Sequence, residues 1–380
     1  MNALSLFSGI GVGEAMLRGT SVKVRVANEF EPSRAKAYSE IYPETTMIQG
    51  DITNTEVMAS VISASKQNSV DIVFATPPCQ GMSRAAGIPI VGDPRNNLIS
   101  PVIDAVAAIK PKYVLVENVK RLFEVRVHHR GLNARVLDLL HKALGDQYHI
   151  LSAVVDLKDF AVPQSRIRAF ILMTRKDQSE AWQLPQKNNE VVTLRSAIGH
   201  LPSLDPYVTD ISDGAHLKLF PNFNERLAEG LAVSQWHKPP THIMRQVLTM
   251  MHTPTGKTAF NNKVYFPKTK DGKRVRGYLS TYRRLTWDAP AKTITMDNRK
   301  ISSQNNVHPG RLLNTAQNRK QIYSDARALS IFELMLLMTM PPHWQPPTVL
   351  SEPSLRSLLG EGLPPLFLKN LVSNLPKANV

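Results

Sequence analysis

The residue with the clearest chemical potential is Cys79, the only cysteine among the 380 residues of the chain. It follows Thr76, Pro77 and Pro78, which end an apolar run typical of a buried strand. A thiol at a strand end, near helix N-termini, can lose its proton more readily than usual and act as a nucleophile. The two prolines fix the backbone that leads to it. Taken alone, the residue fits an inert cysteine equally well.

A carboxylate and two guanidinium groups are expected near this thiol. The run KYVLVENV predicts a strand that ends at Glu117, at the same edge of the sheet as Cys79. Further along, Gln164, Arg166 and Arg168 occupy alternate positions of an extended segment, so we expect all three to face one way. Such a set of groups can hold a polar substrate and a phosphate at once.

A glycine-rich turn near the start of the chain suggests a ligand site. Gly9, Gly11 and Gly13 follow an apolar run, at a point where a predicted strand turns into a helix. Glycines in such a turn let a ligand approach the backbone closely. A dinucleotide fingerprint requires a further glycine where this chain has Glu14. The turn alone also fits a tight connection without a ligand.

Two carboxylates sharpen this expectation, because each follows a further predicted strand. Glu29 lies about 20 residues after the first glycine, where a carboxylate commonly accepts hydrogen bonds from ribose hydroxyls. Asp51 ends the next strand and can accept from the amino group of an adenine. Each could instead cap a helix. Their order favours a nucleoside cofactor without phosphates, and S-adenosylmethionine fits that description.

The charge of the chain points to a polyanionic partner. The net charge is +15 and the isoelectric point is near 9.9. The excess is concentrated at 263–300, where eleven Lys or Arg accompany three Asp. A solvated surface is the alternative, but nucleic acid is favoured because such segments release counterions from phosphate backbones. Lys273, Arg274 and Arg276 are the central candidates for that contact.

The elements that must position these residues follow from hydrophobic patterning. Strands are predicted at 2–7, 22–28, 70–76, 112–118, 149–156 and 168–174, with helices between them at 31–42 and 100–110. This alternation predicts an α/β fold with a largely parallel sheet and helices on both faces. The pattern dissolves over 181–300, which predicts a smaller, irregular domain. Helical patterns return at 325–338 and near the end of the chain.

These motifs together resemble those of the DNA cytosine carbon-5 methyltransferases of bacterial restriction-modification type. FSGIG opens the chain, and PPCQ, ENV and QSRIR follow in the family's order and at its distances. RRLTWDAPAKTIT at 283–295 and GEGLPPLFLKN at 360–370 resemble later motifs, so the likeness covers most of the chain. It implies a Rossmann-like, S-adenosylmethionine-dependent methyltransferase sheet. Residues 1–180 and 351–380 form the implied catalytic and cofactor-binding domain, and 181–350 the small domain with the target-recognition region.

The resemblance also implies a mechanism. The Cys79 thiolate adds to carbon 6 of a cytosine flipped out of double-stranded DNA, and carbon 5 then takes the methyl group of S-adenosylmethionine. Glu117 hydrogen-bonds to ring nitrogen 3 and the exocyclic amino group. Arg166 helps to orient the base and Glu117, whereas Arg168 contacts the cytosine oxygen or a phosphate.

Further residues take roles by the same resemblance. Phe7 and Phe30 flank the adenine, and Pro78 and Leu98 line the pocket of the methyl donor. The full cofactor-binding set is Phe7, Gly9, Gly11, Glu29, Phe30, Asp51, Ile52, Pro78 and Leu98. The DNA-binding set is Gln80, Ser83, Gln164, Lys273, Arg274 and Arg276. Candidates for reading the target sequence, which the chain does not disclose, are His237, Thr253, Asn261, Asn262 and Arg276.

Two positions depart from the family pattern. Val12 stands where the family often has glycine, and Glu361 stands where it usually has asparagine. The second difference leaves open how the last motif contacts the cofactor.

Three other functions share some of these features. A tRNA cytosine carbon-5 methyltransferase shares PPCQ and ENV but usually carries a Cys-Phe-Thr signature, which a chain with one cysteine lacks. An amino-group methyltransferase is disfavoured because its motif ends in an aromatic residue rather than a nucleophile. A catalytically silent DNA-binding homologue is disfavoured because Cys79, Glu117, Arg166 and Arg168 are all present. Protection of host DNA beside a restriction enzyme is the expected context, with a solitary methylase second.

Composition bounds the remaining possibilities. A single cysteine excludes an intrachain disulfide and suits a reducing cytosol. The first residues lack a basic leader, and the longest apolar run contains Glu333 and is too short for a membrane span. His128 and His129 lack the spacing of a metal site. We therefore expect a cytoplasmic, nucleoid-associated monomer without a metal or a membrane partner.

Overall fold

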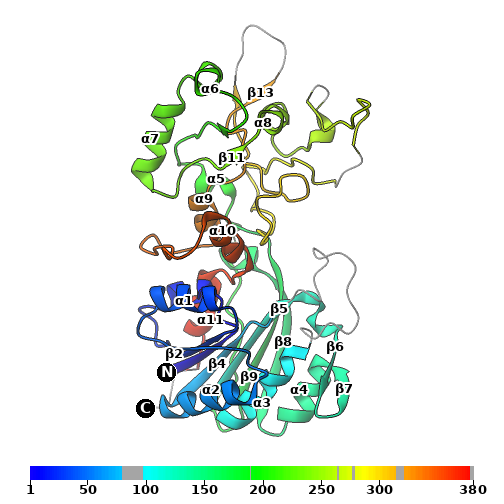
Figure 1. Cartoon of the computed structure of the whole chain (residues 1–380). Helices are drawn as coiled ribbons and strands as arrows, with labels where there is room; N and C mark the ends of the chain where they lie inside the picture. The colour runs from blue at the N-terminus through cyan, green and yellow to red at the C-terminus, as the bar shows by residue number, and fades with distance from the viewer. Residues whose placement is uncertain (79–96, 189, 263–264, 276–278, 314–320, 377–380) are drawn as a thin grey trace.

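The computed structural model describes residues 1–78, 97–188, 190–262, 265–275, 279–313 and 321–376. A lower lobe is built on one large sheet, and an upper lobe consists of short helices, two-residue strands and long connections (Figure 1).

Seven strands form the sheet, in the order β3-β2-β1-β4-β5-β9-β8. The first five pair in parallel, whereas β9 runs antiparallel to both β5 and β8. This confirms the predicted α/β fold with a mostly parallel sheet. The strands are β1 (Asn2–Leu6), β2 (Lys23–Glu29), β3 (Thr46–Gln49), β4 (Val70–Ala75), β5 (Tyr113–Val119), β8 (Tyr148–Asp156) and β9 (Ile167–Arg175).

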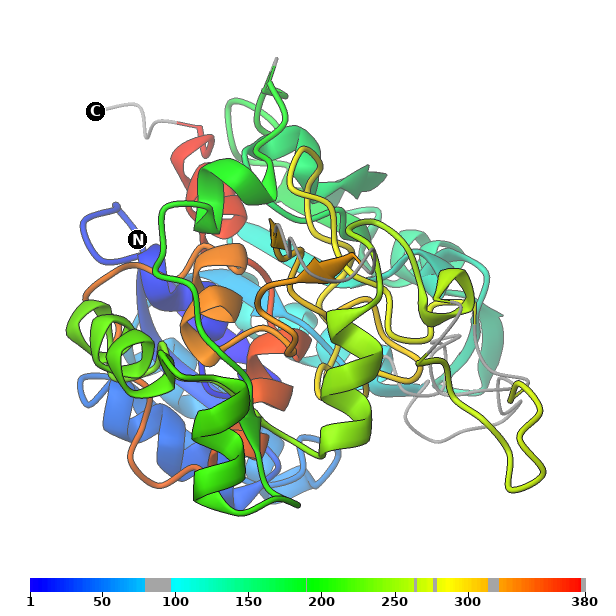
Figure 2. The ribbon, with the colours of Figure 1, turned by 90° about the horizontal axis from the view of Figure 1, so that it is seen from above.

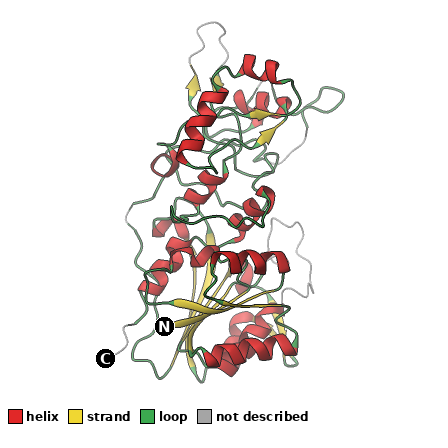
Figure 3. Ribbon diagram, turned by 60° about the vertical axis from the view of Figure 1, so that its left-hand side comes forward, coloured by secondary structure: helices red, strands yellow, loops and turns green. Residues whose placement is uncertain are grey.

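Helices cover both faces of the sheet, as Figure 3 shows. Side chains alternate along the strands, so that Val114 and Val116 pack on one face and Tyr113 and Leu115 on the other. One face packs against α2 (Thr55–Gln67), α3 (Ile99–Ile109) and α4 (Val136–Leu144). The other lies toward α1 (Pro32–Ile41) and α11 (Pro365–Ser373) (Figure 1). The glycine turn leads into the 3-10 helix η1 (Val12–Met16).

A small hairpin extends the lower lobe beyond β5. The 3-10 helix η4 (Lys120–Phe123) connects β5 to β6 (Arg126–His129), which pairs with β7 (Leu132–Arg135). The turn between the strands is Arg130-Gly131, and both residues have a positive φ. That geometry is typical of two-residue hairpin turns.

The upper lobe has its own apolar core and a buried group of charges. Its helices are α5 (Leu194–Ile198), α6 (Asp213–Leu219), α7 (Phe223–Val233), α8 (Met244–Met251), α9 (Ile331–Leu337) and α10 (Glu352–Glu361). Its strand pairs are β10 (Tyr207–Val208) with β11 (Thr241–His242), and β12 (Leu312–Leu313) with β13 (Ile322–Tyr323). The buried Arg327 donates to both oxygens of Glu333 at 2.8 Å and to Asp325 at 2.9 Å. Buried charges tolerate desolvation only when paired in this way, so this group fixes the connection into α9.

A further apolar core joins the two lobes. It contains Ile10 and Val12 of the glycine turn, together with side chains of α5, α9, α10 and the segment 285–294. Helix α10 therefore packs against α9, although the predicted division places them in different domains. The division at 180 and 351 stays a prediction. Within the described ranges, no helix has the length and apolar character needed to span a membrane.

Candidate active site

Glu117 and Arg168 form an ion pair at the edge of the sheet. Glu117 lies near the end of β5, and Arg168 lies near the start of the antiparallel neighbour β9. The register pairs Val119 with Arg168 and Glu117 with Phe170, so the two charged side chains are diagonal neighbours on one face. Arg168 Nε lies 2.9 Å from Glu117 Oε1, and both side chains are mostly buried. The predicted meeting of a carboxylate and a guanidinium at this edge is therefore present.

The next residue, Asn118, holds the segment that leads to the cysteine. Its side chain lies on the opposite face of β5, where Nδ2 donates to the carbonyl oxygen of Pro77 at 2.9 Å. Thr76 Oγ1 also donates to the carbonyl oxygen of Phe7 at 3.2 Å. These bonds fix the proline segment at the end of β4, between β1 and β5. Asn118 has no predicted role, although its place directly after Glu117 on a strand implies that its side chain lies on the opposite face.

Gln164 and Arg166 differ from the sequence prediction. Only Arg168 belongs to β9, because the strand begins at Ile167. Arg166 is 1% exposed and donates to the carbonyl oxygens of Ile294, Gly360 and Glu361 at 2.9 to 3.1 Å. The pairing partner of Glu117 is thus Arg168, not Arg166, because the Arg166 guanidinium is committed to backbone carbonyls elsewhere.

The prediction that Gln164 contacts DNA is also not supported. Its side chain is 0% exposed, Oε1 accepts from the backbone N–H of Ile294 at 2.9 Å, and Nε2 lies 3.3 Å from Met338 Sδ. An amide enclosed in this way joins the two lobes and leaves no surface for a nucleic acid. The sequence could not reveal this, because the partners lie more than a hundred residues away.

The glycine turn has the open backbone that a ligand site requires. Phe7, a bulky residue, has a φ of 57°, a conformation that costs on the order of 1–3 kcal/mol and concentrates at functional sites. Gly9 also has a φ of 57°, and an added Cβ there would meet no atom within 4 Å. Glu29 accepts hydrogen bonds from the backbone N–H groups of Gly9 and Glu31, at 2.8 and 2.9 Å, with one bond on each carboxylate oxygen. Each oxygen keeps a lone pair for a further donor.

The other predicted cofactor residues lie at the same edge of the sheet. Phe30 follows β2 with 64% of its side chain exposed, and Asp51 is exposed after β3, where Oδ1 accepts from Thr53 N and Oγ1. Ile52 is buried in the core, so its side chain supports the turn rather than facing solvent. Pro78 and Leu98 are the last and second described residues on either side of 79–96, and both are partly buried. A carboxylate acceptor, an exposed ring and an open glycine backbone fit a nucleoside.

A buried acid lies directly beneath the glycine turn. Glu14 is 7% exposed and accepts a short hydrogen bond from the Tyr38 hydroxyl, while Tyr42 donates to the carbonyl oxygen of Gly11 at 2.7 Å. Burial raises the pKa of Glu14 to about 7, against the opposing effect of its hydrogen bonds with Ser5 and Tyr38. Gly11 has no room for a side chain, because a Cβ would lie 2.3 Å from the Tyr42 ring.

Glu361, which departs from the family pattern, has a specific partner. Its two oxygens accept from Arg34 Nη1 and Nη2 at 2.8 and 3.3 Å, which joins the end of α10 to α1. The adjacent Gly362 lies against Val12, since a Cβ there would come within 2.6 Å of the Val12 side chain. The segment 360–362 is thus held by Arg34, Arg166 and the glycine turn together.

The basic segment of the upper lobe includes a projecting hairpin over 267–275, seen at the right in Figures 1 and 2. Lys273 is exposed and pairs with Asp271 at 3.1 Å. Arg274 is also exposed, and its guanidinium stacks over the ring of Phe266 at 4.4 Å. Both predicted DNA-contacting residues therefore face outward.

Among the four candidates for target recognition that the structure describes, only Asn261 is exposed. His237 and Thr253 are 0% exposed and Asn262 is 3% exposed. His237 is held by Ser330 Oγ and the carbonyl oxygen of Pro202 at 3.1 Å. These three polar side chains support the lobe from inside, so we no longer expect them to read bases.

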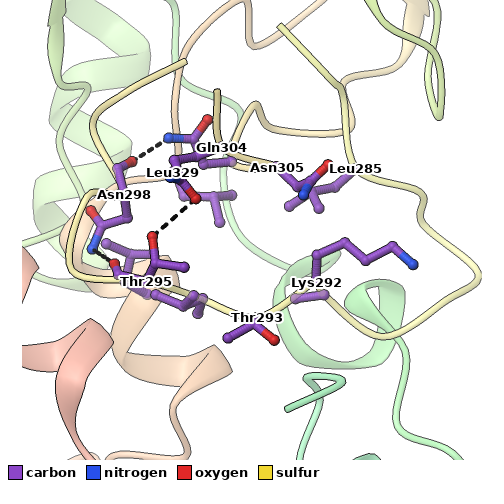
Figure 4. A pocket seen from close by; sticks show the side chains of 12 residues that line it. Leu285, Lys292, Thr293, Thr295, Asn298, Gln304, Asn305 and Leu329 are labelled. Atoms are coloured by element: carbon purple, nitrogen blue, oxygen red, sulfur yellow. Dashed lines mark hydrogen bonds between the residues drawn. The ribbon is translucent and has the colours of Figure 1, made fainter. Parts of the chain in front are cut away.

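A small pocket lies between the segments 285–295 and 298–306 of the upper lobe (Figure 4). Asn298 and Asn306 line it and are 3% and 4% exposed. Thr295 Oγ1 donates to Gln304 Oε1 at 3.1 Å across one side. None of the predicted catalytic or cofactor-binding residues lines this pocket, so it is separate from the edge of the sheet described above.

Four predicted residues lie outside the described residues: Cys79, Gln80, Ser83 and Arg276. Within the described ranges, no group of three or more His, Cys, Asp or Glu side chains is arranged to hold a metal ion.

Comparisons with known proteins assign this architecture to a family. The profile described as C-5 cytosine-specific DNA methylase matches residues 1–377. The Type II methyltransferase M1.HgaI of Avibacterium volantium is 38% identical over 380 residues, which cover 99% of this chain and 98% of that protein. M.Eco47II of Escherichia coli is 25% identical over 350 residues, covering 90% of this chain and 71% of that protein.

Solved structures show the same fold. A DNA modification methyltransferase encoded within an Escherichia coli prophage superposes with a TM-score of 0.65 at 19% identity, covering 99% of this chain and 98% of the other. Dnmt2 of S. pombe superposes with a TM-score of 0.58 at 16% identity, covering 98% and 97%. With a profile that spans nearly the whole chain and a relative at 38% identity, this protein belongs to the C-5 cytosine-specific DNA methylase family and is a DNA cytosine carbon-5 methyltransferase.

Proposed function

We propose that the protein transfers a methyl group from S-adenosylmethionine to carbon 5 of a cytosine flipped out of a specific double-stranded DNA sequence, through a covalent adduct with Cys79. The observation that supports this most directly is the Glu117–Arg168 ion pair of 2.9 Å on β5 and β9. Glu117 follows Val116, which pairs with Ala75 at the end of β4. The next residue, Asn118, donates to the carbonyl oxygen of Pro77 at 2.9 Å, two residues before Cys79. A nucleophile and an oriented carboxylate are what attack on carbon 6 of cytosine requires.

The chain's own groups account for each step. The Cys79 thiolate would add to carbon 6, which makes carbon 5 nucleophilic toward the methyl group that S-adenosylmethionine would supply, its sulfur leaving as a neutral thioether. Transfer of the carbon 5 proton to a solvent base would then expel the thiolate and restore the aromatic ring. Glu117 hydrogen-bonds to nitrogen 3 and the exocyclic amino group, which stabilises the charge that develops on the ring. Arg168 fixes the Glu117 carboxylate in that position.

The cofactor site is the edge formed by the glycine turn, Glu29, Phe30 and Asp51. When bound there, S-adenosylmethionine supplies a methyl group activated by a positively charged sulfur. Glu29 accepts from the ribose hydroxyls, Phe7 and Phe30 flank the adenine, and Asp51 accepts from its amino group. Ile52 supports this turn from the core, and Pro78 and Leu98 border the methyl donor.

We assign the protein to DNA modification of the restriction-modification type. What supports this context is the similarity to Type II methyltransferases, including the relative that is 38% identical over nearly its whole length. Methylation of the target cytosine in that context protects host DNA from a partner endonuclease. Host DNA carrying the gene should therefore resist cleavage at the methylated sequence.

The covalent step is tested with a Cys79→Ser variant and a duplex in which 5-fluorocytosine replaces cytosine. A base can remove a proton from carbon 5 but cannot remove fluorine in the same way, so the adduct persists. The wild-type protein should therefore stay crosslinked to the DNA in denaturing gels. The serine variant should form no crosslink and no product, yet bind duplex DNA with nearly wild-type affinity. Normal turnover by Cys79→Ser would contradict the mechanism.

A further inference from the structure

The β6–β7 hairpin carries positive charge that the proposed mechanism does not use. Residues 120–135 contain five Lys or Arg and one Glu. The strands alternate, so that Val127 and His129 are buried while Arg126, His128, Asn133 and Arg135 are exposed. The outward face of the hairpin therefore presents hydrogen-bond donors and two guanidinium groups.

Two of these guanidinium groups oppose each other directly. The antiparallel register pairs Arg126 with Arg135, and His128 with Asn133. Like charges at directly opposite positions of two strands destabilise the pairing. Arg126 Nη2 donates to the carbonyl oxygen of Asn133 at 2.6 Å, a partner that does not neutralise its charge. An anion shared between the two side chains would remove this repulsion.

Nearby carboxylates pair with other cations of the segment 120–135. Asp104 of α3 accepts from Arg130 at 2.8 Å, and Glu124 lies 3.6 Å from Arg121. Asp138 in the first turn of α4 is exposed, and within the described ranges no ion pair joins a carboxylate to Arg126 or Arg135. These two cations are thus oriented outward without internal compensation among the described residues.

The hairpin is fixed at the edge of the sheet that holds Glu117. It follows β5 after only the short helix η4, and Figure 1 places β6 and β7 beside α4. His129 Nδ1 lies 2.8 Å from Ser100 Oγ, and the backbone N–H of His128 donates to Asn97 Oδ1 at 3.1 Å. The hairpin and the 267–275 hairpin of the upper lobe lie toward the same side of the molecule in Figures 1 and 2.

We propose that the exposed face of the β6–β7 hairpin, centred on Arg126 and Arg135, is a second DNA-binding surface that holds a backbone phosphate of the duplex. This deepens the proposed function and rests on duplex DNA being the substrate. Paired guanidinium groups match the geometry of a phosphate, and contacts of this kind orient the duplex without reading its sequence. The duplex then contacts both lobes, at 267–275 above and at β6–β7 below.

The test is the double variant Arg126→Gln/Arg135→Gln, measured by fluorescence anisotropy on 30-base-pair duplexes of two unrelated sequences between 50 and 300 mM salt. Affinity should fall roughly tenfold at low salt, by the same factor for both sequences, and the slope of log K against log salt should become shallower by about 1, as expected for one lost phosphate contact. Without DNA, the variant should melt at the same temperature as wild type or higher, because like-charge repulsion is removed.

The matched control is Lys23→Gln/Lys66→Gln, which removes two exposed cations at the start of β2 and in the last turn of α2. Its affinity and salt slope should equal those of wild type. The proposal is overturned if the hairpin variant, with unchanged melting temperature and S-adenosylhomocysteine binding, keeps the wild-type slope, or if the control loses as much. Arg126→Lys/Arg135→Lys, which keeps both charges, should retain most of the slope.

Methyl transfer by the wild-type protein distinguishes a failure of the hairpin proposal from a failure of the proposed function. If wild type methylates duplex DNA and the slope does not change in the variant, only the hairpin contact fails. If wild type transfers no methyl group to DNA, the proposed function fails whatever the slope does.

Discussion

Arg166 and Arg168 are two residues apart, and the structure gives them different tasks. Arg168 pairs with Glu117 at 2.9 Å, whereas Arg166 donates to three backbone carbonyl oxygens contributed by 294 and 360–361. A lysine offers a point charge instead of a planar fork, so it cannot reproduce either arrangement. We therefore expect Arg168 to act in catalysis and Arg166 to act in folding stability.

We expect Arg166→Lys to lose on the order of 2–4 kcal/mol of unfolding free energy, because several buried carbonyl groups lose their donors. Arg168→Lys should unfold at nearly the wild-type denaturant concentration but lose most of kcat, since the Glu117 carboxylate is no longer fixed. Urea unfolding and steady-state kinetics on both variants measure this difference. The same stability loss in both variants would contradict the division of roles.

Glu14 makes a pH-dependent contribution to stability. Burial raises its pKa to about 7 in the folded protein from 4.5. Between these values the folded state holds a proton that the unfolded state has released, so this contribution to stability falls as the pH rises and is lowest above pH 7. Glu14→Gln should therefore be more stable than wild type at pH 8, by about 1–3 kcal/mol. Urea unfolding at pH 8 and pH 5 should show this gain shrinking at the lower pH, and a gain that is equal at both values would refute the assignment.

At the scale of elements, the sequence predicted the framework well and the side-chain partners poorly. The six predicted strands and the helices at 31–42 and 100–110 are present, because periodicity of apolar residues reports which face is buried. The meeting of Glu117 with a guanidinium followed from strand ends sharing one edge of the sheet. The antiparallel direction of β9 and the burial of Gln164 did not follow, since they depend on segments distant in sequence.

The ion pair between α1 and α10 explains the unusual glutamate of the last motif. Glu361 accepts hydrogen bonds from two guanidinium nitrogens of Arg34, at 2.8 and 3.3 Å. The side chains of both residues are about 30% exposed. Arg34→Glu and Glu361→Arg should each lose roughly 1 kcal/mol of unfolding free energy, the upper range for a partly exposed pair. The double variant restores opposite charges and should recover at least half of the loss. A double variant as unstable as the sum of both single changes would exclude a direct interaction.

At the scale of the whole molecule, the net charge of +15 predicts DNA binding that weakens steeply with salt. Lys273 and Arg274 belong to the most basic segment and are exposed on the 267–275 hairpin. Lys273→Gln/Arg274→Gln should make the slope of log K against log salt shallower by about 1 to 2. The Lys23→Gln/Lys66→Gln variant again serves as the charge-matched control. An unchanged slope would move the upper-lobe contact to another surface.

The measurement that tests the central claim most directly is methyl transfer from labelled S-adenosylmethionine to unmethylated duplex DNA, followed by digestion and identification of the labelled nucleoside. We predict label in 5-methyl-2′-deoxycytidine from DNA, none in N4-methyl-2′-deoxycytidine or N6-methyl-2′-deoxyadenosine, and none in a parallel reaction with tRNA. Label in tRNA alone, or in an amino-methylated base, would contradict the proposed chemistry at Cys79 and Glu117.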